Sequence, residues 1–504
     1  MSNIGRARAL IRQLGAAGTK VFCVCAGSRN SPLLAVLGAS DLHLYSFFDE
    51  RSAAFFALGR IKRDGIPVAV ITTSGTAVAE LLPATIEAHY SSLPLVLVTA
   101  DRPARFRGSG APQCIEQEGI FGPYAETAVD SWTRCAPLHI NIEFDEPLID
   151  EEPGTLRLPE SAPLMEDRHS CLSTSGADRQ ECLSSMERPL VILGQLATED
   201  RDRVAEWTSR LGAPIYAEAL SGLREDPRIA PLAIRAGERM IARGGFDGVI
   251  RIGGVPTLRF WRDLEHSQRE LPVVSFSSSQ FVGLTRGEIH PIDHLPVMPR
   301  RERVDDFLAL DAEKATAIGA LLDEEPHSEP ALFRRISLEI GVGARVYLGN
   351  SLPIREWDLF ASWLPRQWSM EGNRGANGID GQLSTFLGWC AAGAENVAIV
   401  GDLTAMYDLN APWVVPQLAE DIRFRIIAVN NGGGKIFSRV GSLSAMSPEV
   451  RSRIVENSHD VSLEHWAAMW RLPYNEPDAE RGVIELRPDA GATKRFWGRY
   501  DSLW

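Results

Sequence analysis

The feature that most constrains this chain is a series of short, mainly apolar runs that alternate with helical patterns. Near the N-terminus the apolar runs lie at 21–25, 42–48, 68–72 and 95–99, and the helical patterns between them lie at 51–63 and 77–90. A strand that is apolar along its whole length is buried on both faces, which is typical of a parallel sheet covered by helices. We therefore predict an α/β fold.

The same alternation recurs twice further along the chain. A chain of 504 residues is too long for one hydrophobic core, so several domains are expected. A polar stretch around 165–185 and an acidic, proline-containing stretch at 322–330 separate the three α/β units. We expect three doubly wound parallel-sheet domains, at 1–165, 188–325 and 340–504.

Composition argues against several classes of partner. The formal net charge of -14 disfavours a nucleic acid or an anionic membrane surface as partner. The N-terminal stretch has the pattern of an amphipathic helix and not of a secretory signal, and no apolar run approaches the roughly 20 residues of a membrane span. The seven cysteines include no Cys-x-x-Cys pair, which predicts neither a zinc site nor a disulfide framework and favours a cytoplasmic location.

Polar side chains follow two predicted strands of the third unit. Asp402 comes after the apolar run NVAIV, and Asn430 and Asn431 come after FRIIAV. The carboxyl ends of parallel strands meet at one edge of a sheet, where α/β proteins bind ligands. Mg²⁺ prefers oxygen ligands, which the Asp402 carboxylate, the Asn431 amide and the Gly433 carbonyl can supply if a diphosphate completes the octahedron.

Each of these motifs alone has a simpler interpretation, because Asp402 could cap a helix and the two asparagines could form a turn. Together they match a cofactor signature. Asp402 and Asn431 are 29 positions apart, and the order Gly-Asp-x, spacer, Asn-Asn is that of thiamine-diphosphate enzymes. We predict that Asp402, Asn431 and Gly433 bind thiamine diphosphate through Mg²⁺ or Mn²⁺.

Glu50 is the candidate for the acid that activates this cofactor. Thiamine diphosphate needs a carboxyl group at N1′ of its aminopyrimidine, and burial raises a carboxyl pKa toward the value that sharing a proton requires. Glu50 ends the run LYSFFDE and begins a helical pattern in the first unit. The alternative is an ordinary acid in a first helical turn, where it stabilises the helix dipole.

Several longer segments carry a resemblance to one family. They are AGSRNSPL (26–33), FDER (48–51), TTSGTAVAELLPATIEA (72–88), TADRP (99–103), GAPQCIEQEGIFG (110–122), GNSLPIREWD (349–358), NRGANGIDG (373–381), GDLTAMYDLNA (401–411) and NNGGGKIFS (430–438). In these segments the chain resembles the 2-succinyl-5-enolpyruvyl-6-hydroxy-3-cyclohexene-1-carboxylate synthases, the MenD family of thiamine-diphosphate enzymes. The matching segments span most of the first and third units.

The resemblance implies a fold, a reaction and an assembly. It implies pyrimidine-binding, central and diphosphate-binding domains, in that order. The implied reaction decarboxylates 2-oxoglutarate and adds the resulting carbanion to isochorismate, a step of menaquinone biosynthesis. The active site would form between the pyrimidine-binding domain of one subunit and the diphosphate-binding domain of another, in a homodimer or homotetramer.

The resemblance also implies roles for individual residues. Those implied to contact substrates or intermediates are Ser28, Arg29, Gln113, Ser351, Arg355 and Arg374. Those implied to contact the cofactor are Glu50, Thr76, Ile379, Asp402, Leu403, Asn431, Gly433, Ile436 and Phe437. Both substrates are dicarboxylates, and guanidinium groups bind carboxylates bidentately, so converging arginines fit this chemistry. Without the resemblance, the arginines would be interpreted as surface charges, the serines and Gln113 as turn or capping residues, and the apolar residues Ile379, Ile436 and Phe437 as core.

The chain departs from the family pattern at three places. Ala26 stands where the family usually shows a proline, Pro112 where it usually shows an asparagine, and Arg259-Phe260 where a Lys-Arg pair is usual. Three alternatives stay open. One is another thiamine-diphosphate carboligase of the acetolactate-synthase type, which acts on pyruvate. The others are a nucleotide-binding α/β protein, disfavoured by the absence of Gly-rich phosphate motifs, and a non-catalytic paralogue.

Overall fold

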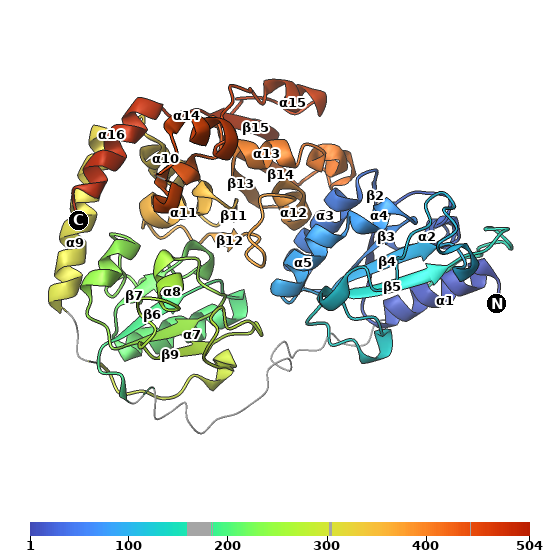
Figure 1. Ribbon diagram of the computed structural model, residues 1–504, viewed down its shortest axis with the longest axis horizontal. Helices are drawn as coiled ribbons and strands as arrows, with labels where there is room; N and C mark the ends of the chain where they lie inside the picture. The colour runs from blue at the N-terminus through green and yellow to red at the C-terminus, as the bar shows by residue number, and fades with distance from the viewer. Residues whose placement is uncertain (159–182, 184, 302–304, 444) are drawn as a thin grey trace.

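Three parallel sheets make up the computed structural model, which describes residues 1–158, 183, 185–301, 305–443 and 445–504 (Figure 1). Each sheet has five strands, in the orders β2-β1-β3-β4-β5, β7-β6-β8-β9-β10 and β12-β11-β13-β14-β15. The order is the same in all three, counted along the chain as 2-1-3-4-5. This confirms the three doubly wound sheets, whereas the domain boundaries stay a prediction.

The shared strand order locates the ligand-binding edge of each sheet. In a 2-1-3-4-5 sheet the winding reverses between the first and third strands, and ligands bind outside the carboxyl ends of the strands at that switch point. In the first sheet the switch point lies between β1 and β3, and in the third between β11 and β13. Functional side chains are therefore expected in the loops that follow these strands.

The first sheet occupies the N-terminal part of the chain. Its strands are β1 (Val21–Cys25), β2 (His43–Phe47), β3 (Val68–Thr72), β4 (Leu95–Asp101) and β5 (Leu138–Glu143). Its helices are α1 (Asn3–Ala16), α2 (Ser31–Gly38), α3 (Glu50–Asp64), α4 (Thr76–Ala79) and α5 (Leu82–Tyr90). The single helix predicted over 77–90 is interrupted, because Pro83 in the first turn of α5 has no N–H to continue a helix from α4.

The second sheet lies in the middle of the chain. Its strands are β6 (Pro189–Leu193), β7 (Ile215–Ala217), β8 (Gly248–Ile252), β9 (Val273–Phe276) and β10 (Ile289–His290). The accompanying helices are α7 (Thr198–Leu211), α8 (Arg259–Asp263) and α9 (Asp305–Glu324).

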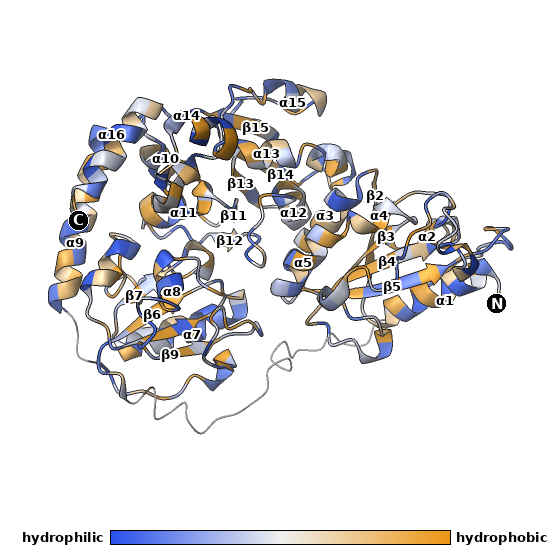
Figure 2. Ribbon diagram, in the orientation of Figure 1, coloured by the Kyte–Doolittle hydropathy of each residue, from blue (hydrophilic) through white to orange (hydrophobic). Residues whose placement is uncertain are grey.

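The third sheet is the C-terminal one. Its strands are β11 (Arg345–Leu348), β12 (Ser369–Glu371), β13 (Glu395–Gly401), β14 (Arg423–Val429) and β15 (Arg481–Leu486). Its helices are α10 (Glu329–Glu339), α11 (Leu352–Phe360), α12 (Gln382–Trp389), α13 (Asp402–Tyr407), α14 (Pro448–Val450), α15 (Glu464–Met469) and α16 (Ala490–Asp501). Apolar residues concentrate along the central strands of the first sheet, β3 and β4 (Figure 2). Strands β3 and β4 are buried at every position, as the apolar runs predict.

Helices α3 and α12 join the first and third sheets, and they pack side by side (Figure 1). Glycines allow this close approach. A Cβ on Gly59 would lie 1.9 Å from the carbonyl oxygen of Thr385, and one on Gly388 would lie 2.1 Å from that of Phe56. The hydroxyls of Ser52 and Ser384 hydrogen-bond across the same contact at 2.9 Å. The start of α3, where Glu50 lies, is thereby fixed relative to the third sheet.

Two expectations drawn from composition can be compared with the structure. Within the described ranges, no helix has the length and apolarity needed to cross a membrane. Cys23, Cys25, Cys114 and Cys390 carry free thiols. Cys135, however, is disulfide-bonded, a bond that the sequence reasoning did not anticipate. The scattered spacing of the cysteines carried no signal for this bond.

Candidate active site

Asp402 links the two polar motifs of the third sheet. It begins α13 directly after β13 and is 2% exposed. One carboxylate oxygen accepts hydrogen bonds from the backbone N–H groups of Gly432 and Gly433, at 2.9 Å each, and the other accepts from the N–H of Leu403 at 2.6 Å. The residues that follow β13 and β14 therefore meet, as their positions at neighbouring strand ends predict.

The two asparagines after β14 have different environments. The Asn430 amide donates to Glu485 and to the carbonyl of Val461, at 2.7 and 2.8 Å. The Asn431 amide donates to Glu329 at 2.9 Å, whereas its oxygen Oδ1 is buried and has no hydrogen-bond partner among the described residues. A buried amide oxygen without a partner is costly unless a ligand satisfies it. Asn431, and not Asn430, is thus the available ligand.

The backbone at Gly433 fits only glycine. Its φ is +128°, and a Cβ there would lie 2.5 Å from the carbonyl oxygen of Glu456. The Gly433 carbonyl accepts the N–H of Lys435 at 2.8 Å, which leaves its second lone pair available. The site can thus offer one carboxylate, one amide oxygen and one carbonyl. This all-oxygen donor set, with its orphaned Oδ1, fits Mg²⁺ or Mn²⁺.

Two residues at this edge were missed by sequence reasoning. Glu329 begins α10, and burial raises its pKa to about 7. His459 lies with Nε2 3.3 Å from an Asp402 oxygen, without hydrogen-bond geometry, while its Nδ1 accepts the N–H of Val461. Both are remote from Asp402 and Asn431 in sequence and belong to no motif that marks them. Only the fold identifies them.

Glu50 occupies the corresponding edge of the first sheet. It is the first residue of α3, and Asp49 caps the helix by accepting the N–H of Ser52 at 3.1 Å. Partial burial is the largest cause that raises the pKa of Glu50, and the charge of Asp49 raises it further. The hydroxyl of Thr72, at the end of β3, donates to Glu50 over 3.5 Å. A raised pKa is what the activating acid requires.

Other predicted residues surround this edge. Ser28, Thr76 and Gln113 are exposed. Gln113 has a φ of +54° and lies beside Gly75, where a Cβ would be 3.1 Å from its Cα. Arg29 differs, because it is 7% exposed and its guanidinium donates to the Phe144 carbonyl and pairs with Glu146 at 3.3 Å. Those internal contacts leave it fewer donors for a substrate.

Arg355 and Arg374 lie where the second and third sheets meet. Arg374 donates to Asn350, which follows β11, and Arg355 donates to the carbonyl of Ser351 at 2.6 Å. Burial, above all, and the charge of Arg355 lower the pKa of Arg374, while the carboxylate of Glu218 opposes this shift. Ser351 has a φ of +75°, an uncommon value for a residue other than glycine. Strain of this kind is frequent at binding sites.

The apolar residues predicted to contact the cofactor are not core residues. Ile379, Leu403 and Ile436 are half-buried, and Phe437 is 38% exposed. Ile436 and Phe437 belong to the 3₁₀ helix η9 (Lys435–Arg439), which follows the glycines that approach Asp402. Their exposure allows contact with a ligand and removes the alternative that Phe437 is core.

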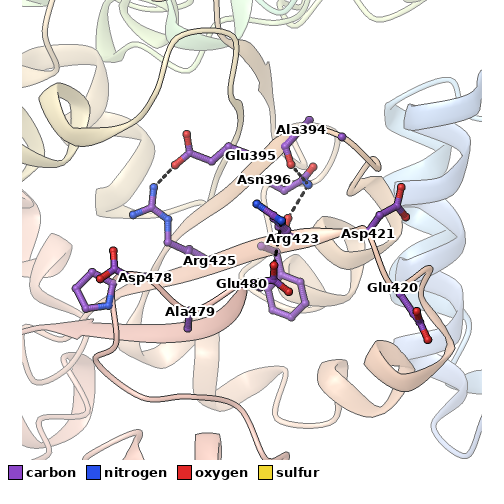
Figure 3. Close-up of a pocket in the computed structure, with 13 residues that line it drawn as sticks. Ala394, Glu395, Asn396, Glu420, Asp421, Arg423, Arg425, Asp478, Ala479 and Glu480 are labelled. Carbon is purple, nitrogen blue, oxygen red and sulfur yellow. Dashed lines mark hydrogen bonds and ion pairs between the residues drawn. The ribbon is translucent and has the colours of Figure 1, made fainter.

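A separate cavity of about 640 Å³ lies at the other end of the third sheet. Its lining includes Glu395 and Arg423, the first residues of β13 and β14, whereas Asp402 and Asn430 follow those strands. Arg423 pairs with Glu480 at 3.0 Å, and Arg425 pairs with Glu395 (Figure 3). This cavity is therefore distinct from the candidate active site.

Comparison with known proteins agrees with this geometry. Residues 6–120 match the family model described as the thiamine pyrophosphate enzyme N-terminal TPP binding domain. A protein of Bdellovibrio bacteriovorus is 43% identical over 100% of both chains, and one of Akkermansia muciniphila is 39% identical over 97% of both. A protein of Chloroflexus aurantiacus is 33% identical over 92% of this chain and 88% of its own. All three are named 2-succinyl-5-enolpyruvyl-6-hydroxy-3-cyclohexene-1-carboxylate synthase. The chain belongs to this family of thiamine-diphosphate-dependent synthases.

Proposed function

We propose that this chain is the synthase that decarboxylates 2-oxoglutarate and joins the succinyl unit to isochorismate, using thiamine diphosphate and a divalent metal. The observation that carries the proposal is the cradle at Asp402. There a buried carboxylate, two glycine N–H groups and an orphaned Asn431 oxygen converge at the carboxyl ends of neighbouring strands. Similarity over the full length to a synthase of this family, at 43% identity, supports the proposed reaction.

Asp402, Asn431 and the Gly433 carbonyl would hold Mg²⁺ or Mn²⁺. Within the described part of the chain, no three His, Cys, Asp or Glu side chains are grouped so that they could hold a metal ion. A single carboxylate is too little for a cage made only of protein, but it suits Mg²⁺ that also binds phosphate oxygens. Leu403 and Thr76 would contact the cofactor alongside these ligands, and Ile379, Ile436 and Phe437 would form its apolar wall.

Glu50 would hold a proton at the pyrimidine N1′. Its half-buried carboxyl group, whose pKa is raised, is suited to share a proton and not merely to carry a charge. Bound thiamine diphosphate supplies the electron sink for decarboxylation, and the protein supplies orientation and exclusion of water. In this scheme no side chain becomes a covalent nucleophile.

Substrate carboxylates would be bound by arginines. Arg355 and Arg374 converge although their charges repel, an arrangement that an anion would stabilise. Ser351 would contact the substrate beside this pair, and Ser28, Arg29 and Gln113 would contact it from the first sheet. Arg29 would first have to give up its contact with Glu146.

We also propose a homo-oligomer, a dimer or a tetramer. Apolar side chains of the first and third sheets are exposed together beside Glu50. Phe48 is 53% exposed and its ring lies 4.8 Å from that of Trp413, and Tyr407, Leu409 and Met469 are also exposed. Exposed large apolar side chains in contact, such as Phe48 and Trp413, are typical of protein interfaces. A second copy of the chain is the proposed occupant, so that two subunits contribute to each active site.

Light scattering after gel filtration measures this assembly. Met469→Glu changes a side chain that is 61% exposed, so it should weaken the oligomer without disturbing the fold. A protein that is monomeric at all concentrations would contradict the interface.

We propose a cytoplasmic location, because four of the described cysteines carry free thiols. Cell fractionation tests this location. Titration of free thiols before and after reduction tests whether Cys135 forms a disulfide bond.

The reaction is tested by measuring CO2 release with thiamine diphosphate and Mg²⁺. We expect release from 2-oxoglutarate and consumption of isochorismate. Release from pyruvate instead would favour a carboligase of the acetolactate-synthase type, since pyruvate has no second carboxylate for the arginines. Absence of release from any 2-oxo acid would refute the proposed activity.

A further inference from the structure

The Asn431 amide can occupy its site in two orientations that differ by exchange of oxygen and nitrogen. Only one orientation presents an oxygen that a cation can bind, and the other presents an NH2 group, which cannot bind a metal. The backbone does not select between them, because both ends of the amide have nearly the same shape. A neighbouring group must therefore make the selection.

Glu329 is that neighbour. Its oxygen Oε1 accepts a hydrogen bond from the Asn431 NH2 group at 2.9 Å, and Asn431 Oδ1 is left buried without a partner among the described residues. The oxygens of an ionised carboxylate accept hydrogen bonds and do not donate them. Glu329 therefore disfavours the flipped amide, which would bring two oxygens together.

Glu329 is itself held rigidly. It is 3% exposed and is the first residue of α10. Its backbone N–H donates to the hydroxyl of Thr493 at 2.9 Å, and the hydroxyl of Ser328 caps the helix by accepting the N–H of Ala331. Its position is thus set by α10 and α16, and not by the loop that carries Asn431.

We propose that Glu329 is a positioning residue, which orients the Asn431 amide oxygen toward the metal that the cofactor requires. This inference rests on the proposed function of the site. Glu329 contributes no metal ligand of its own, and it acts only through Asn431. Groups that orient metal ligands are needed for affinity, and their loss typically weakens metal binding by about 10- to 100-fold.

The test is a titration of the protein with Mn²⁺ at saturating thiamine diphosphate, with free Mn²⁺ measured by electron paramagnetic resonance. Glu329→Leu removes the acceptor, so the Kd for Mn²⁺ should rise about 10- to 100-fold. Glu329→Gln keeps an oxygen that can accept from Asn431, so it should restore most of the affinity. Because glutamine also keeps the shape of glutamate, an unchanged Tm in Glu329→Leu is needed to exclude a role in packing alone.

The matched control is Glu356→Gln. Glu356 is a second buried carboxyl group, 1% exposed, whose charge interacts with that of Glu329, but neither of its oxygens hydrogen-bonds within the described residues. We expect its Mn²⁺ affinity to equal that of the unmodified protein. Circular dichroism and Tm establish that each variant folds. If Glu329→Leu does not fold, Glu329→Ala removes the acceptor without adding bulk.

The outcomes separate this inference from the proposed function. If the unmodified protein binds Mn²⁺ but the Leu and Ala variants bind it equally tightly, Glu329 does not position Asn431 and the inference is wrong. Equal losses in the Gln and Leu variants would also overturn it, since the acceptor would not be the cause. Failure of the unmodified protein to bind Mn²⁺ would overturn the metal site itself.

Discussion

Gly59→Ala tests whether the close contact of α3 and α12 fixes the start of α3, where Glu50 lies, relative to the third sheet. The added Cβ would lie 1.9 Å from the Thr385 carbonyl oxygen and 2.7 Å from the Trp389 nitrogen. Carbon and oxygen atoms in close contact are about 3.3 to 3.6 Å apart, so the helices must separate by more than about 1 Å. Overpacking of this kind costs about 1–3 kcal/mol.

The displacement should also lower activity, because α3 begins at Glu50. A misplacement of about 1 Å can reduce a rate roughly 10²-fold. We expect a lower Tm and a lower kcat for CO2 release. Gly319→Ala in α9 is the control, since a Cβ there meets nothing within 4 Å, and alanine is favoured over glycine in a helix by about 0.5–1 kcal/mol. Unchanged Tm and kcat in Gly59→Ala would refute the reasoning.

Three further predictions concern single carboxyl groups. Glu50→Gln cannot share a proton, so kcat should fall about 10²- to 10⁴-fold while cofactor binding, followed by fluorescence, persists; full activity would disprove its role. Asp402→Asn turns an NH2 group toward backbone N–H donors, which costs about 1–3 kcal/mol and removes the carboxylate from the proposed set of metal ligands. Mn²⁺ titration should therefore detect much weaker binding, and unchanged binding would exclude Asp402 as a ligand. Burial raises the pKa of Glu225 from 4.5 to about 7, so the folded state binds this proton more tightly than the unfolded state does. The stability that Glu225 contributes is present below about pH 4.5 and is lost as the pH rises to about 7. Glu225→Gln should flatten that part of the profile of urea midpoint against pH, and an unaltered slope would show that Glu225 does not titrate in this range.

The fold, and the sheet edge at which Asp402 and Asn431 lie, could be predicted from sequence because composition locates the ends of strands. The apolar runs before Asp402 and Asn430 mark where β13 and β14 stop, and parallel pairing then brings the following residues to one edge. The adjacency of Asp402 and Gly433 follows from this rule. Glu50 could be located in the same way, at the junction of β2 and α3.

The residues that sequence reasoning missed depend on contacts between distant segments. Glu329 and Asn431 are 102 positions apart and belong to different elements, so no local pattern relates them. The engagement of Arg29 with Phe144 and Glu146, 115 positions away in the first case, is equally invisible in sequence. Spacing predicts neighbours within one sheet edge, but it does not predict which helix packs against that edge.

Diffraction at the manganese absorption edge, from crystals grown with thiamine diphosphate and Mn²⁺, tests the central claim most directly. We predict one anomalous peak per chain, about 2.1 to 2.2 Å from an Asp402 carboxylate oxygen, the Asn431 amide oxygen and the Gly433 carbonyl. A peak elsewhere, or a metal bound without Asp402 and Asn431, would contradict the account.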